Sequence, residues 1–107
     1  MPFTIIIPKI SADIEDLDKQ KQEEFVLEHI LSGIQIKSLK NGESFVNLNH
    51  NTVHIKNLSH EKWTVNDVNV LKFTNHPSKR VSVIEIDGVL NERKNPFAKR
   101  NIQVHYR

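Results

Sequence analysis

The apolar residues of this chain come in short blocks separated by turn-forming residues, and this pattern limits the fold more than any other feature. Residues 3–7 form a run rich in β-branched side chains, which Pro8 ends, and residues 81–86 show the clearest strand pattern. Unbroken apolar character over residues 3–7 predicts a strand that is buried on both faces. With 107 residues, the chain is expected to form one domain, residues 1–107, around one modest core.

One segment, residues 12–31, has the spacing of a helix instead. Ser11 is its expected N-cap, and acids follow in the first turns, where the helix dipole favours anions. Residues 18–24 contain no apolar side chain, so the first half of this helix is expected to project into solvent. A break near Asp18 that gives two short helices is the alternative. The packed half is predicted to use Val26, Leu27, Ile30 and Leu31.

After Gly33 the period of the apolar residues changes from helical to alternating. Residues 34–37 and 45–48 are expected to pair as a hairpin about the turn Asn41-Gly42, because Asn-Gly is a strong signal for a tight turn. Residues 53–56 are predicted to form the next strand of the same meander.

The last third of the chain extends the predicted sheet and completes the expected fold. For residues 68–73, a strand is favoured over a helix begun by the capping box of residues 64–67, and residues 102–106 are predicted as the last strand. The expected fold class is α+β, with one long N-terminal helix packed on a mostly antiparallel sheet of five to seven strands. A β-barrel or sandwich with a decorating helix is the alternative. The predicted core of the sheet comprises Ile5, Ile7, Ile34, Ile36, Val46, Leu48, Val53, Ile55, Val83, Ile84, Ile86, Ile102 and Val104.

Charge is unevenly distributed along the chain. Residues 1–45 carry five Lys against eight Asp and Glu, whereas residues 73–107 carry seven Lys and Arg against three. This split favours a non-catalytic protein-binding or regulatory protein, such as an inhibitor, an immunity protein or a phage-type regulator, that docks by charge complementarity through an acidic helix and basic loops. The expected partner-binding residues are Asp13, Glu15, Asp16, Asp18, Glu23 and Glu24.

The basic C-terminal third supports a second hypothesis, a small nucleic-acid-binding module. Three dibasic pairs and an aromatic residue among them suit phosphate contact combined with base stacking. The net charge of the whole chain is only +2, which weakens this hypothesis relative to a protein partner. Its candidate residues are Lys79, Arg80, Arg93, Lys94, Phe97, Lys99 and Arg100.

Metal and catalytic sites have less support. The histidines at positions 50, 54, 60 and 76 are candidate ligands, but the sequence does not show that three or four of them converge, so neither metal nor cofactor is expected. A nuclease needs an acid, a base and a phosphate clamp, which makes a small His/Glu-based nuclease the second alternative; an enzyme is less favoured than a binding protein. The residues that would serve it are His54, His76, His105, Glu85, Arg80 and Arg107.

The composition also bears on the setting in which the chain acts. It contains no Cys, which fits a reducing compartment. No apolar run approaches the ~20 residues that span a bilayer. We therefore expect a cytoplasmic protein without a membrane partner, and homo-oligomerisation is left open.

Overall fold

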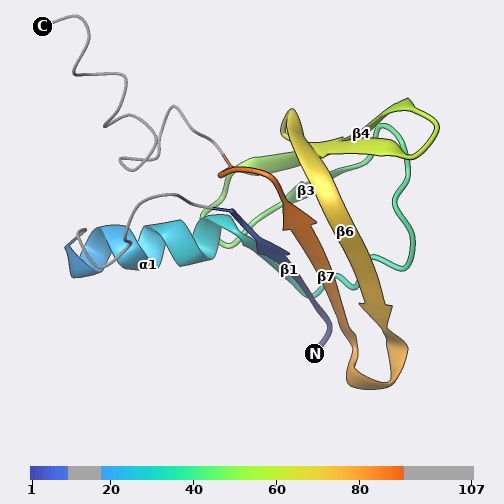
Figure 1. Ribbon diagram of the computed structural model, residues 1–107. Helices are drawn as coiled ribbons and strands as arrows, with labels where there is room; N and C mark the ends of the chain where they lie inside the picture. The colour runs from blue at the N-terminus through green and yellow to red at the C-terminus, as the bar shows by residue number, and fades with distance from the viewer. Residues whose placement is uncertain (10–17, 91–107) are drawn as a thin grey trace, which may run out of the picture.

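The computed structural model describes residues 1–9 and 18–90, which form a seven-stranded sheet with one α-helix (Figure 1). In chain order the elements are β1 (Phe3–Ile7), α1 (Lys19–Glu28), β2 (Ile30–Ser32), β3 (Ser44–Val46), β4 (Thr52–Ser59), β5 (Lys62–Val65), β6 (Val68–His76), the 3-10 turn η2 (Pro77–Lys79) and β7 (Val81–Ile86). The strand order across the sheet is β2-β1-β7-β6-β5-β4-β3. β1 and β7 run parallel, and the other neighbours are antiparallel.

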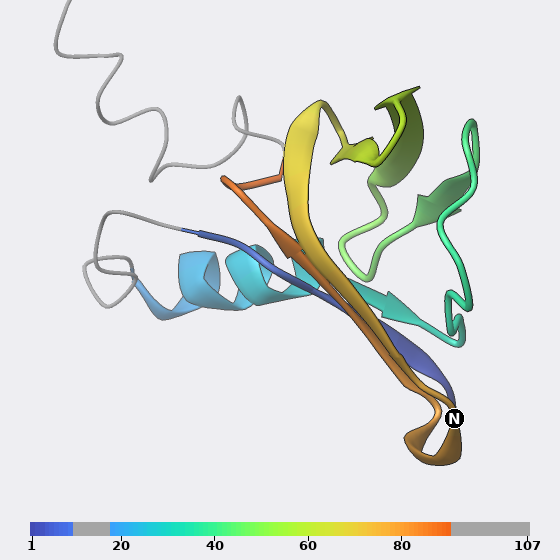
Figure 2. The same cartoon turned by 45° about the vertical axis from the view of Figure 1, so that its right-hand side comes forward.

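The sheet curls until its two edge strands almost meet, so that it resembles a nearly closed barrel. The edges β2 and β3 are bridged just beyond β3, where the Leu48 N–H donates to the Ile30 carbonyl at 3.0 Å. We use the name seam for the line along which β2, together with the segment that follows it, faces β3. Figure 2 shows β3 and α1 on opposite sides of the ribbon that β1, β7 and β6 form. The predicted fold class, a long helix packed on a sheet, is therefore wrong, and the structure is closer to the alternative of a barrel with a decorating helix.

The helix is shorter than residues 12–31. α1 has ten residues and begins after Asp18, whose carboxylate accepts from the Lys21 N–H at 2.8 Å as its N-cap. Ile30 and Leu31 lie in β2 instead, because pairing with β1 satisfies their backbone and places Leu31 in the core. The predicted cap Ser11 lies outside the described residues. α1 projects past the edge of the sheet in both views (Figures 1 and 2).

The buried face of α1 also differs from the predicted stripe. Phe25 and Glu28 are its buried residues, Leu27 is half-buried, and Val26 is 49% exposed. A helix this short that projects from the sheet buries only its last turn, so a regular apolar stripe is not needed.

The core lies on the inner face of the curled sheet, and β1 contributes to it with one face only. Thr4 and Ile6 are buried, whereas Ile5 and Ile7 are 38% and 45% exposed, so the prediction that β1 is buried on both faces is wrong. Val46 and Leu48 are also exposed, because Phe45 and Asn47 take the inward positions there. The prediction is confirmed for Ile36, Val53, Ile55, Ile84 and Ile86, while Ile34 and Val83 are half-buried and Ile102 and Val104 lie outside the described residues.

Two predicted connections have different outcomes. The hairpin of residues 34–37 with 45–48 is wrong, because residues 34–37 are not a strand and β3 pairs with β4. The strand predicted for residues 68–73 is confirmed as part of β6. The capping-box alternative fails because Asn66 and Asp67 both have positive φ (49° and 68°), which is the geometry of a tight turn between two strands.

Candidate functional site

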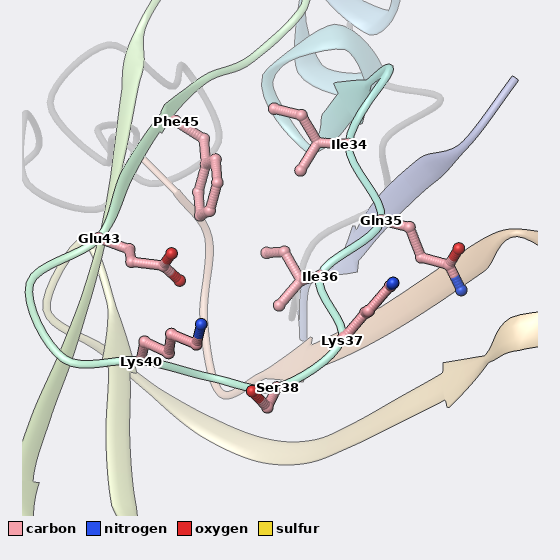
Figure 3. Close-up of a pocket in the computed structure, with 8 residues that line it drawn as sticks. All are labelled: Ile34, Gln35, Ile36, Lys37, Ser38, Lys40, Glu43 and Phe45. Carbon is pink, nitrogen blue, oxygen red and sulfur yellow. The ribbon is translucent and has the colours of Figure 1, made fainter.

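A groove opens along the seam, between the segment after β2 and the start of β3 (Figure 3). It has a volume of about 230 Å³, and we call it the seam groove. One wall is the segment 34–38 after β2, and the other holds Glu43 and Phe45 at the start of β3. Its full lining is Ile34, Gln35, Ile36, Lys37, Ser38, Lys40, Glu43 and Phe45. The side chains of Ile34, Ile36 and Phe45 make an apolar centre, with Lys40 and Glu43 to one side of it.

The first wall of the seam groove is not a strand, yet side chains from the sheet hold it in place. The Thr4 hydroxyl of β1 donates to the Ile34 carbonyl at 2.7 Å and accepts from the Ile36 N–H at 3.1 Å. The Ser82 hydroxyl of β7 donates to the Ile36 carbonyl. Gln35 donates to the Asn75 side chain of β6 at 2.7 Å. Three neighbouring strands thus fix the wall through polar side chains.

The second wall presents an open sheet edge. The Ile55 N–H donates to the Glu43 carbonyl and the Asn47 N–H to the Asn51 carbonyl, both at 2.9 Å, so the odd-numbered residues here bond to β4. Backbone groups alternate in direction along a strand, which turns those of Ser44 and Val46 toward the seam. Within residues 1–9 and 18–90, β3 has no second neighbour in the sheet. The seam groove therefore lies beside unpaired strand backbone.

A buried polar cluster closes the other end of the seam. The Glu28 carboxylate, at the end of α1, accepts from the side-chain amides of Asn47, Asn49 and Asn51, with shortest distances of 3.2, 2.7 and 2.9 Å. Asn47 also donates to the Glu28 carbonyl at 2.9 Å, and its oxygen accepts from the N–H groups of Asn49 and Asn51. We call these four residues the seam latch. It ties the end of the helix, next to β2, to the turn between β3 and β4, and so joins the two edges at this end of the seam.

His29, next to the seam latch, is buried in a defined tautomer. Its Nδ1 lies 2.8 Å from the Phe25 carbonyl, and its Nε2 lies 3.2 Å from the Leu90 N–H. Because the carbonyl only accepts and the N–H only donates, Nδ1 carries the proton and Nε2 accepts. Burial lowers the pKa of His29, although the hydrogen bond to Phe25 and the charge of Glu28 act to raise it.

The lowered pKa of His29 predicts a loss of stability in mild acid. In the unfolded chain, His29 has its ordinary pKa of 6.5 and is protonated at a higher pH than in the folded chain. We therefore expect the free energy of unfolding to fall as the pH drops below 6.5 toward the depressed pKa. Urea unfolding between about pH 7.5 and about pH 5.5 measures this slope. His29→Gln should flatten it and the exposed His60→Gln should not; equal slopes in all three proteins would contradict the assignment.

The predicted partner-binding acids lie away from the seam groove. Asp18 caps α1, and Glu23 and Glu24 are exposed on it. The predictions for Asp13, Glu15 and Asp16 fall outside the described residues. The structure thus gives Asp18 a structural role and leaves the binding role of the acidic helix a prediction.

The predicted nucleic-acid residues are described only in part. Lys79 ends η2 and Arg80 follows it with φ 57°, and both are exposed at the turn between β6 and β7. The other candidates fall outside the described residues: Arg93, Lys94, Phe97, Lys99 and Arg100. Neither Lys79 nor Arg80 lines the seam groove.

The residues proposed for a metal or a nuclease are not brought together. In the part of the chain that the structure describes, no group of three His, Cys, Asp or Glu could hold a metal ion. His54, on β4, contacts the Ser44 hydroxyl at 2.8 Å, while Glu85, on β7, lies in register with Lys72. Two strands, β5 and β6, separate His54 from Glu85 in the sheet, and His105 and Arg107 lie outside the described residues. His54 and Glu85 therefore do not form an acid–base pair, and His76, at the end of β6, lies in register with Val81.

Sequence reasoning missed the seam groove and the seam latch. The usable signal for the latch was the spacing of Asn47, Asn49 and Asn51, since every second residue of an extended segment faces the same way. The groove had no such signal, because its first wall resembles an alternating strand. No protein-family model and no curated protein matches the chain. Among the described helices, none is both long enough and apolar enough to cross a bilayer.

Proposed function

We propose that this chain is a non-catalytic protein-binding protein and that the seam groove receives a short segment of its partner. The observation that supports this most is the open edge of β3 beside an apolar groove. Unpaired strand edges invite pairing with another chain, and proteins usually cover or blunt them. Here the edge is short and its neighbour is a concave wall fixed by three strands.

The size of the groove favours side chains of a protein over a small ligand. Cofactor and substrate pockets are generally about 300–1,000 Å³. The seam groove, at about 230 Å³, is smaller and has room for one or two apolar side chains. Its ionisable lining is Lys37, Lys40 and Glu43, without the histidine that the nuclease hypothesis needs.

The seam groove replaces the acidic helix as the first binding surface in this proposal. Glu23 and Glu24, the exposed acids of α1, do not line the seam groove, where a partner's apolar side chains could be buried. Roles as an inhibitor, an immunity protein or a phage-type regulator all fit a small binding protein of this kind. We also propose the cytoplasm as the compartment, which the lack of Cys supports.

A selection from a phage-displayed random peptide library on the immobilised full chain tests the proposal. Peptides enriched on the wild type should bind Phe45→Ala or Lys40→Glu at least about tenfold more weakly, because truncating a buried interface anchor commonly costs more than 1 kcal/mol. Leu58→Ala and Lys62→Glu, which alter exposed residues outside the groove, serve as matched controls and should bind normally. Thermal unfolding of each variant confirms that it is folded.

Three results would overturn the proposal. The first is that no peptide is enriched. The second is that the enriched peptides ignore Phe45 and Lys40 but respond to charge reversal at Glu23 and Glu24, which would return the site to the acidic helix. The third is tight binding of a labelled single-stranded or duplex oligonucleotide that Lys79→Glu and Arg80→Glu abolish, which would favour the nucleic-acid hypothesis.

A further inference from the structure

We infer that the partner segment binds as an extended, acidic strand added to the open edge of β3, with its apolar side chains in the seam groove. This inference rests on the proposed function, because it specifies what the groove receives.

The backbone of β3 requires an extended partner. Ser44 and Val46 each direct one N–H and one carbonyl toward the seam. These groups repeat every second residue, a spacing of about 6.8 Å along a strand. An extended chain presents its own donors and acceptors at the same interval, whereas a helix uses its backbone groups internally. The edge is therefore complementary to a strand and not to a helix.

The groove determines which side chains of that strand are apolar. Residues paired across neighbouring strands point to the same face of a sheet. Phe45 points inward, where it meets Ile34 and Ile36, so a residue paired with Phe45 would enter the same apolar space (Figure 3). Its neighbours on either side would point outward with Ser44 and Val46, which are exposed. The partner is thus expected to alternate apolar and polar residues.

The charge around the edge favours acidic residues at the polar positions. Residues 33–59, which span the seam groove and both β3 and β4, contain three Lys and a single acid, Glu43. Lys37 and Lys40 are exposed, and neither makes an ion pair within the described residues. Lys40 and Glu43 point toward one another in Figure 3 without pairing. Unpaired lysines beside an open edge repel basic strands and attract acidic ones.

Synthetic peptides test the inference on the full chain. The first probe is a short capped peptide of alternating aspartate and valine. Two further peptides replace aspartate by asparagine or by lysine. Two more carry N-methyl groups on every second residue, placed so that they block either the edge of the peptide that would pair with β3 or the opposite edge. We expect the aspartate peptide to bind most tightly and to weaken from about 50 mM to about 500 mM salt. The lysine peptide, and the peptide N-methylated on the edge that pairs with β3, should bind at least about tenfold more weakly.

Amide hydrogen exchange and one variant identify the edge. Bound aspartate peptide should slow exchange at the Ser44 and Val46 amides. Val46→Pro removes an N–H that faces the seam, a change that edge strands tolerate, so it should fold and yet bind the peptide at least about tenfold more weakly. Val46→Ala keeps the N–H and should bind normally.

The outcomes separate this inference from the proposed function. If peptides bind through Phe45 but leave the Ser44 and Val46 amides unchanged, strand addition is wrong and the groove still binds protein. If lysine peptides bind as well as aspartate peptides, the acidic partner is wrong. If those two amides are already protected in the free chain, another occupant holds the edge and the inference fails. Protection that grows with protein concentration would identify a second copy of the chain as that occupant. Protection that does not depend on concentration would identify another part of the same chain. If neither these probes nor displayed peptides bind at the groove, both proposals fail.

Discussion

Glu28→Ala is expected to lower the free energy of unfolding by about 2–4 kcal/mol, because it leaves the amides of the seam latch without their shared acceptor. Asn47 is buried, so it keeps its bond to the Glu28 carbonyl but cannot replace the lost carboxylate by water, whereas Asn49 and Asn51 are half-buried and can be rehydrated in part. This loss is a large share of the roughly 5–15 kcal/mol that stabilises a typical domain. Urea unfolding followed by circular dichroism measures it.

Glu24→Ala is the matched control for this experiment, since it removes an exposed carboxylate from the same helix. A change within about 0.5 kcal/mol is expected there, as for most surface substitutions. If Glu28→Ala proved as mild as Glu24→Ala, the three asparagines would have found other partners. The seam latch would then not hold the end of the seam, and the separation of the two edges would need a different explanation.

Thr4→Val should have an effect of similar size for a different reason. Valine has the shape of threonine but lacks the hydroxyl that donates to the Ile34 carbonyl and accepts from the Ile36 N–H. Both hydrogen bonds are lost at a residue that is 0% exposed, so about 2–4 kcal/mol of stability should disappear. The same variant should loosen the first wall of the seam groove and weaken peptide binding even where the chain remains folded.

Thr52→Val provides the comparison for Thr4→Val, because it makes the same chemical change at an exposed position of β4. We expect it to alter stability by less than about 0.5 kcal/mol. Equal effects at Thr4 and Thr52 would show that the Thr4 hydroxyl does not hold the wall of residues 34–38. If Thr4→Val is destabilised but still binds peptide normally, the Thr4 hydroxyl stabilises the fold without determining the shape of the groove.

The strands could be predicted where alternation and turn residues agree. Val53 and Ile55 alternate with polar residues between two turns, and both are fully buried in β4. Ile84 and Ile86, on either side of Glu85, are likewise buried in β7. At these positions the side chains that the sequence pattern predicts to be buried are buried in the structure, because a curled sheet forms its core from one face of each strand. Residues 68–73 favour a strand for a different reason, because Val68, Asn69 and Val70 are poor helix formers.

The errors arose where tertiary pairing outweighs local pattern. Ile30 and Leu31 continue the helical spacing of α1, but pairing with β1 draws them into β2. Residues 34–37 alternate like a strand, yet side chains of Thr4, Ser82 and Asn75 satisfy their polar groups instead of a neighbouring strand. Such contacts join residues 30 or more positions apart. No pattern within a short window contains them, which is why the candidate site was not predicted.

The two ends of the seam differ in whether the edges of the sheet are joined. At one end, Glu28 and three asparagines join the edges and the Leu48 N–H reaches the Ile30 carbonyl. At the other end, the wall of residues 34–38 is held by side chains of the sheet and, among the described residues, β3 has no second neighbour besides β4. Because the seam is joined at one end, the edge of β3 at the other end is held in place before a strand binds, which lowers the cost of ordering it.

Amide hydrogen exchange of the free, full-length chain, resolved by residue with NMR, tests this description of the seam most directly. The Asn47 and Leu48 amides, which donate to Asn51 and Ile30, should exchange slowly. The Ser44 and Val46 amides, on the same short strand but facing the seam, should exchange fast at low protein concentration. Fast exchange at all four amides, or slow exchange at all four, would contradict a seam that is closed at the latch and open at the groove.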